Sequence, residues 1–409
     1  MKEWGIQGAV ILTPEEELKG SSVEIKDSRI ERVSREKPRP SLAITAEDAV
    51  LTPGLINSHD HLLGTYYPKV GFGPYENWLP WDNDLKSAPV YQERQQIENR
   101  DLYLLGAYRN LVSAVTTVSD HIPHFVNEPY LDILPTKAIR NYSLSHSIAS
   151  FALAWGGEID VEYRKALKED IPFITHIAEG FDAETKQDLK TLDRKGGLGD
   201  HSVLVHGIAF NEEDIKVIKQ RGASVVWCAD SNVFMFNTTA NVKRMLDVGV
   251  NVCIGTDSPM SGGENILYEM KFDRTYFKKT YGKDLPEETI VRMVTANPAK
   301  AFYLKKNGHV KSGNVADLAL FRNTRKNAYD SVVSAGLKDV LLVVIDGRPV
   351  YGDARYAYLF DALKVTYQHI VMDGEEKIII GDLVGMLRRI SKAVGFKKEF
   401  PFMPVEFRV

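Results

Sequence analysis

Histidine and acidic residues follow apolar runs at widely separated points of this chain. His59 and His61 come after the run LTPGLIN, and His176 lies within FITHIAEG. His206 ends the run VLVH, and Asp257 follows VCIGT. Short apolar runs rich in β-branched residues are typical of buried strands, so we expect each of these side chains at a strand end. Imidazole nitrogen and carboxylate oxygen are ligands that Zn²⁺ and similar ions take up in proteins.

The spacing of His59 and His61 favours a shared ligand. Residues i and i+2 of a strand point to the same side, so both imidazoles can converge on one ion. Taken alone the pair is weak evidence, because a single buried histidine is more often a hydrogen-bonded core residue. Such groups at several strand ends are hard to explain by packing, since burying them without partners costs several kcal/mol. The sequence therefore predicts a metal site.

The elements that position these residues alternate in type. From residue 171 onward, apolar runs such as SVLVHGIAF and ASVVWCADSN alternate with helical stretches such as NEEDIKVIKQRG. This alternation indicates βα units and a parallel sheet. In a barrel of parallel strands the carboxyl ends form the active-site face. We expect an α/β fold with the metal site on that face.

The two ends of the chain predict different structures. Short β-type runs in the first 50 residues (GAVIL, SSVEI, RIERV) and near the other end (ADLALF, DVLLVVIDGRPV) are expected to complete one small sheet. The segment from Ile380 to Val394, with Leu383, Leu387 and Ile390 at helical spacing, predicts an amphipathic helix. We expect this helix to dock on the protein's own body or on a sister subunit; a membrane-surface role is the alternative.

The composition excludes several classes of protein. The 409 residues include 51 lysines and arginines against 55 acidic residues, a formal charge of −4, which gives no electrostatic case for nucleic acid or an acidic membrane. No apolar stretch is long enough for a secretory signal or a membrane span. Both cysteines, Cys228 and Cys253, lie in apolar runs typical of the core. We expect a cytoplasmic protein with a small-molecule partner.

The order of the motifs identifies a family resemblance. They are PGLINSHDH, TTVSDH, THIAEG, VHGIAF, WCADSN, GTDSPMSGGENILYEM, TANPAKAFYL and GNVADLALF, between about Gly54 and Phe321. This order resembles the metal-dependent amidohydrolase superfamily, specifically its triazine hydrolase and aminohydrolase branch, which includes guanine, adenosine-type and pterin deaminases. The resemblance implies a (β/α)8 barrel of the TIM type with a small β-sandwich built from both termini.

The resemblance also implies a division of the chain. Residues 1–50 plus 310–360 would form the sandwich, 51–309 the hydrolase barrel, and 361–409 a C-terminal helical extension. Between Asp120 and Asn141 there are too few residues for a full helix and strand, so we expect the third βα unit to be distorted.

By the same resemblance, the site would hold one divalent ion, Zn²⁺ or alternatively Fe or Mn. Its ligands would be His59, His61, His176 and Asp257. Glu179 would be the proton shuttle, Asp257 would also accept a proton, and His206 would be a polarising group or an additional ligand. The two-metal members of the superfamily use a carboxylated lysine, and the corresponding strand NYSLSHSIASF has none.

Three residues are candidates for substrate contact. His146 lies where the family often has a substrate-contacting histidine, with an ordinary polar role as the alternative, and His121 is expected to face the pocket. Trp81 belongs to the aromatic loop GTYYPKVGFGPYENWLPWDNDLK, and long loops are commonly lids or binding elements. Its ring would stack on a planar heterocycle; alternatively the aromatic residues pack the loop onto the barrel or fill a dimer interface.

The favoured function is an aminohydrolase (deaminase) of a small planar N-heterocycle, such as a purine, pterin, pyrimidine or triazine, acting as a homodimer. Glu179 supports it, because a carboxyl group there can supply the proton that makes nitrogen a leaving group. The alternatives are a cyclic or linear amide hydrolase, or hydrolytic removal of another ring substituent. A non-catalytic scaffold would be expected to lack a ligand or the shuttle, and all of them are present.

Overall fold

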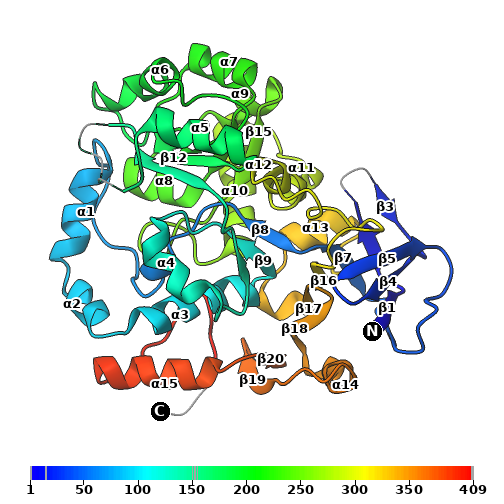
Figure 1. Ribbon diagram of the computed structural model, residues 1–409. Helices are drawn as coiled ribbons and strands as arrows, with labels where there is room; N and C mark the ends of the chain where they lie inside the picture. Colours follow the sequence, from blue (N-terminus) through cyan, green and yellow to red (C-terminus); the bar gives the residue numbers. More distant parts are fainter. Residues whose placement is uncertain (1, 14–15, 150, 152, 154, 407–409) are drawn as a thin grey trace.

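Parallel strands and helices alternate through the central part of the chain. Figure 1 shows the computed structural model, which describes residues 2–13, 16–149, 151, 153 and 155–406. The parallel strands form a three-stranded sheet, β10-β9-β8, and a five-stranded sheet, β11-β12-β13-β14-β15. Their bounds are β8 Leu55–Asn57, β9 Val115–Val118, β10 Lys137–Ala138, β11 Ser143–Ser147, β12 Phe173–Ile177, β13 Ser202–His206, β14 Ser224–Trp227 and β15 Asn251–Ile254. The expected α/β fold is confirmed.

Helices follow these strands along the chain. They include α3 Asn99–Val112, α4 His124–Leu131, α5 Ile159–Glu169, α6 Asp188–Arg194, α7 Glu212–Arg221, α8 Ala229–Phe236, α9 Val242–Asp247 and α10 Ile266–Tyr281. Strands β12 and β13 are buried at every residue, which is why they read as continuous apolar runs. The N–H of Ser58 donates to the carbonyl of Ile254 (3.1 Å), so the ends of β8 and β15 lie side by side.

The third strand–helix unit is short. Helix α4 has 8 residues with Pro129 inside it, and β10 has only 2 residues. Among the described residues no ladder joins β10 to β11. The segment between β9 and β11 is too short for elements of the usual length, and proline removes a backbone donor from the helix.

Strands from both ends of the chain share one antiparallel-rich sheet. Its order is β19-β20-β18-β17-β16-β7-β2-β3, beside a four-stranded sheet β5-β4-β1-β6. The bounds are β1 Glu3–Gln7, β2 Val10–Leu12, β3 Glu17–Leu18, β4 Ser22–Lys26, β5 Arg29–Ser34, β6 Ala43–Thr45, β7 Ala49–Pro53, β16 Leu318–Arg322, β17 Val340–Ile345, β18 Arg348–Asp353, β19 Gln368–Met372 and β20 Glu375–Ile379. Strands β19 and β20 lie inside the expected helical extension 361–409, where they form a hairpin at the sheet edge.

The C-terminal helix α15, Leu383–Val394, packs along α3 on the protein's own body (Figure 1). Leu383, Leu387 and Ile390 are buried there. Arg389 clamps both carboxylate oxygens of Asp101 on α3, with its Nε at 3.1 and 3.0 Å. Among the described residues, none of the helices combines the length and apolar character needed to cross a bilayer.

Candidate metal and substrate site

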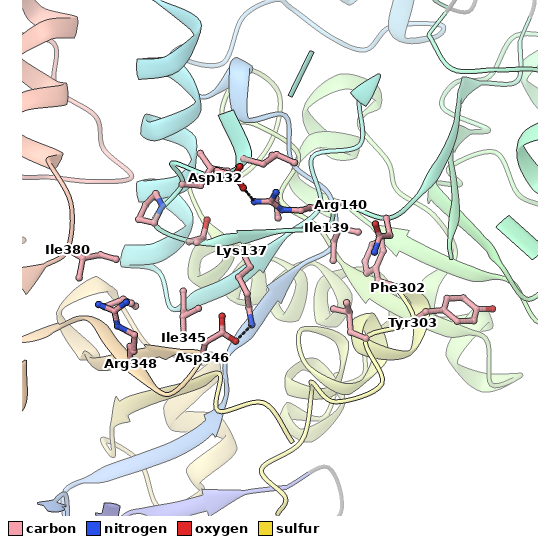
Figure 2. Close-up of a pocket in the computed structure, with 18 of the residues that line it drawn as sticks. Asp132, Lys137, Ile139, Arg140, Phe302, Tyr303, Ile345, Asp346, Arg348 and Ile380 are labelled. Atoms are coloured by element: carbon pink, nitrogen blue, oxygen red, sulfur yellow. Dashed lines mark hydrogen bonds and ion pairs between the residues drawn. The ribbon is translucent and has the colours of Figure 1, made fainter. Parts of the chain in front are cut away.

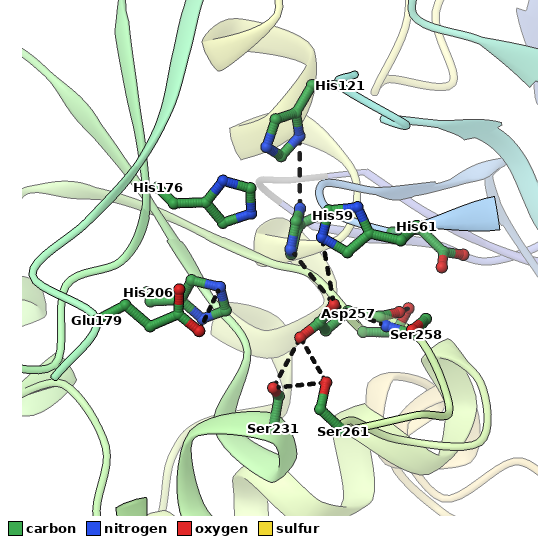
Figure 3. Close-up of polar contacts among 12 residues, drawn as sticks. His59, His61, His121, His176, Glu179, His206, Ser231, Asp257, Ser258 and Ser261 are labelled. Carbon is green, nitrogen blue, oxygen red and sulfur yellow. Dashed lines mark hydrogen bonds and ion pairs between the residues drawn. The ribbon is translucent and has the colours of Figure 1, made fainter. Parts of the chain in front are cut away.

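The predicted site residues converge at the carboxyl ends of the parallel strands (Figure 3). His59 and His61 follow β8, His176 lies in β12, His206 ends β13 and Asp257 follows β15. Two of these turns are strained, because His206 (φ 74°) and Asp257 (φ 52°) adopt the left-handed conformation. Strained backbone of this kind clusters at functional sites, where the surrounding fold holds it.

The expected ligands lie at distances that suit one ion. Oδ1 of Asp257 is 3.6 Å from Nε2 of His59 and 3.7 Å from Nε2 of His61, too long for hydrogen bonds. Two donors bound about 2.1 Å from one tetrahedral Zn²⁺ lie roughly 3.4 Å apart. The His176 ring centroid is 5.0 Å from that of His59. Nε2 of His59 is buried and has no hydrogen-bond partner among the described residues, so the donor set fits a divalent metal.

Neighbouring groups fix the orientation and charge of the imidazoles. Nδ1 of His176 donates to the carbonyl of His146 (2.9 Å), and Nδ1 of His206 donates to Oδ1 of Asn232 (2.9 Å). In each ring this leaves Nε2 with its lone pair. Burial lowers the pKa of His59 to about 3 and holds the pKa of His176 well below its usual value. The rings are therefore neutral and able to bind a metal.

Two serines hold the carboxylate of Asp257. Ser231 and Ser261 each donate to Oδ2 at 2.7 Å, while Oδ1 accepts from the N–H of Ser258 at 2.9 Å. Burial opposes ionisation of Asp257, but its contacts with the histidines outweigh burial and keep its pKa well below the usual range. Ser231 and Ser261 were not predicted from the sequence; their only signal is their place just after β14 and just after Asp257.

Glu179 has the properties of a proton donor. Its side chain is 11% exposed, and Oε1 lies 3.6 Å from Nε2 of His206. Burial, with the negative charge of Asp257, raises its pKa well above the usual value. A carboxyl group with a raised pKa holds its proton more tightly and can give it to a substrate atom.

A cavity of about 450 Å³ opens onto these groups. Its lining includes His61, His146, His176, Glu179, His206 and Asp257, with aromatic walls from Tyr67, Trp78, Trp81, Tyr91 and Trp155. Trp81 also donates from Nε1 to the carbonyl of Val70 (3.0 Å), which fixes its ring. The expected contact residues His146 and Trp81 thus line the cavity.

His121 occupies a different position from the one expected. It is fully buried and does not line the cavity. Its Nδ1 lies 3.4 Å from Nδ1 of His59, and His59, His121 and His176 form a second group whose ligand atoms lie within 4.8 Å of one another. His121 therefore lies against His59 and His176, outside the lining of this cavity.

A larger cavity of about 740 Å³ lies elsewhere (Figure 2). It contains none of the site residues, and two pairs of its charged groups contact each other. Arg140 contacts Asp132 at 2.6 Å, and Lys137 contacts Asp346 at 3.1 Å. Its size does not make it the catalytic centre.

Known proteins share this sequence pattern and fold. The model of the Amidohydrolase family matches residues 158–350, which include His176, Glu179, His206 and Asp257. A 5-methylthioadenosine/S-adenosylhomocysteine deaminase of Pyrococcus furiosus is 26% identical over 372 residues, covering 78% of this chain and 86% of that protein. A 5′-deoxyadenosine deaminase of Methanothrix thermoacetophila is 26% identical over 419 residues, covering 91% and 96%.

Solved structures share the fold. Atrazine chlorohydrolase from Arthrobacter aurescens complexed with zinc has a TM-score of 0.77 at 16% identity, covering 96% of this chain and 100% of that one. An adenosine deaminase from Xanthomonas campestris with bound zinc has a TM-score of 0.74 at 19% identity, covering 95% and 97%. Residues 158–350 thus match the Amidohydrolase family, and the chain has the fold of these zinc-containing structures.

Proposed function

We propose that this enzyme is an aminohydrolase that replaces the exocyclic amine of a planar N-heterocycle with oxygen, and that 5′-modified adenosines are its substrates. The observation that carries the proposal is the carboxyl group of Glu179. Burial raises its pKa, which favours the protonated form, and it lines an aromatic-walled cavity together with His61, His176 and Asp257. The named activities of the two relatives supply the nucleoside class.

His59, His61, His176 and Asp257 would hold one divalent ion, which we propose to be Zn²⁺, with Fe or Mn as alternatives. When bound, such an ion supplies a water molecule that ionises near neutral pH. The imidazole donors favour Zn²⁺ over harder cations such as Mg²⁺.

The protein's own groups would move the protons. Asp257, with Oδ2 held by two serines, presents Oδ1 to accept one. Glu179 would donate one to a ring nitrogen or to the departing amine. Nε2 of His206 is an acceptor, because Nδ1 carries the proton that Asn232 binds. This tautomer favours the role of additional ligand over that of a hydrogen-bond donor to the substrate.

The cavity lining would orient the heterocycle. Trp81 offers a ring fixed by its hydrogen bond to Val70, and such a ring stacks well on a planar base. His146 lies 4.7 Å, centroid to centroid, from the ring of His176. A contact between His146 and the substrate would therefore place the reacting carbon next to the ligands.

We also propose the scaffold that supports this chemistry. The two parallel sheets would act as one (β/α)8 barrel over residues 51–309. Residues 1–50 plus 310–360 would form a β-sandwich, with 361–409 as an extension. In support, one apolar cluster joins Trp4, Ile25 and Ile44 to Leu318, Leu341 and Val344.

The test combines ammonia release with elemental analysis. We expect ammonia from 5′-deoxyadenosine or 5′-methylthioadenosine, in a panel that includes guanine, a pterin, cytosine and an aminotriazine. The variant Glu179→Gln should keep its metal and lose about 10²- to 10⁴-fold in turnover, whereas His59→Ala should lose metal. Wild-type turnover in Glu179→Gln would refute the shuttle, and products formed without ammonia would favour an amide or ring-substituent hydrolase.

A further inference from the structure

The residue between the two H-x-H ligands points away from them into a buried ion pair. Asp60 is fully buried, and Nη1 of Arg109 donates to its Oδ1 and Oδ2 at 2.9 and 2.8 Å. Nδ2 of Asn110 donates to Oδ2 at 2.7 Å. Arg109 and Asn110 lie on α3, so this helix is hydrogen-bonded to the segment that carries His59 and His61.

The same guanidinium holds the loop that presents Asp257. Nη2 of Arg109 donates to the carbonyl of Gly263 at 2.7 Å, and Nε donates to the carbonyl of Glu264 at 2.6 Å. A longer contact of 3.4 Å reaches the carbonyl of Asp257 itself. The planar fork of arginine suits several fixed acceptors at once, which a lysine ammonium cannot match.

A layer of amides joins the same two segments. Nδ2 of Asn57 donates to Oγ1 of Thr256 at 2.8 Å and to Oδ1 of Asn110 at 2.9 Å. Oδ1 of Asn57 accepts from the N–H of Thr256 at 3.1 Å. Polar contacts of Asn57 thus join the segments after β8 and β15.

We infer that Arg109 is a positioning residue that sets the separation between the H-x-H pair and Asp257. Compared with well-packed apolar residues, a buried ion pair is a poor source of stability, so stability alone does not account for this one. The Asp60–Arg109 pair joins the segment of His59 and His61 to the segment of Asp257, whose Oδ1 lies 3.6 and 3.7 Å from the two Nε2 atoms. Asp257 itself has a left-handed φ of 52°. Removing groups that orient metal ligands typically weakens metal binding 10- to 100-fold.

This inference rests on the metal site of the proposed function, so its test measures metal binding directly. We would compare Arg109→Lys, which keeps the charge and loses the fork, with the paired variant Asp60→Asn/Arg109→Met, which removes both charges. The readouts are the Zn²⁺ Kd from competition with a chelator and the visible absorption spectrum of the Co²⁺ form. We expect a Kd that is 10- to 100-fold higher and a changed Co²⁺ spectrum in both variants.

The control is a second ion pair on the same helix. Asp101 on α3 pairs with Arg389 on α15 at 2.8 Å, away from the ligand loops. The variant Asp101→Asn/Arg389→Met should leave the Kd within twofold of wild type and the Co²⁺ spectrum unchanged.

The inference is overturned if folded Arg109→Lys has the wild-type Kd and Co²⁺ spectrum, or if the control pair shifts both as strongly. Arg109→Lys decides the question if the paired Asp60→Asn/Arg109→Met variant does not fold. A wild-type protein that binds no metal would instead refute the proposed function itself.

Discussion

The two carboxylate oxygens of Asp257 have different partners, and hydrogen bonds from two serines fix the orientation of the carboxylate. Ser231 and Ser261 occupy Oδ2, so Oδ1 faces His59 and His61. Replacing both serines by alanine frees the carboxylate to rotate. We expect Ser231→Ala/Ser261→Ala to lower kcat/KM about 10- to 100-fold through weaker metal binding, measured by steady-state kinetics with a metal titration. Ser391→Ala, a buried serine on α15, is the matched control, and wild-type kcat/KM in the double variant would contradict this role.

That the candidate ligands lie close together was predictable from the sequence, whereas the groups that orient them were not. His59, His176 and Asp257 follow recognisable apolar strands, and the carboxyl ends of parallel strands meet on one face. Arg109 is a charged residue within a helical segment, where a solvent-facing side chain is the ordinary expectation. His121 likewise follows a strand, yet its burial behind His59 depends on packing that strand position alone does not determine.

At the scale of elements, the start of α6 supports the loop that carries Glu179. Oδ2 of Asp188 accepts from the N–H of Ala178 (2.9 Å), which has a left-handed φ of 53°. Burial, with the nearby charges of Asp182 and Glu184, raises the pKa of Asp188 to about 7 from 3.8. The folded chain therefore holds this proton more tightly than the unfolded chain, and ionisation costs folding stability as the pH rises from about 4 to 7.

The variant Asp188→Asn should remove that pH dependence and keep an acceptor oxygen for Ala178. One pKa unit corresponds to about 1.4 kcal/mol. The variant should be more stable than the wild type, and we expect this difference in unfolding free energy to be about 1–2 kcal/mol larger at pH 8 than at pH 5. Urea denaturation at both pH values measures it. Asp193→Asn on the same helix, whose carboxylate pairs with Arg221, should show no such difference. An equal gain at both pH values would rule out ionisation of Asp188 as the cause.

Elements with clear periodicity were predicted well, and edge elements were not. The βα alternation after residue 171 and the amphipathic helix near the C-terminus both exist. The hairpin β19–β20 was not predicted, because β20 begins with the charged residues Glu375, Glu376 and Lys377, which are not typical of a strand. The first two are exposed. Lys377 is nevertheless fully buried and donates to the carbonyl of Val340 (2.9 Å), a contact that depends on a distant strand.

At the scale of the whole molecule, α15 covers the helix that carries Arg109. Leu387 on α15 is 2% exposed, and cutting a buried leucine to alanine costs about 2–5 kcal/mol. We expect Leu387→Ala to lower the unfolding free energy by that amount, while Lys392→Ala, on the exposed face, changes it by less than about 0.5 kcal/mol. Because α15 docks on the protein's own body, the loss should be the same at different protein concentrations. A loss that shrinks as the concentration rises would place the docking surface on a sister subunit instead.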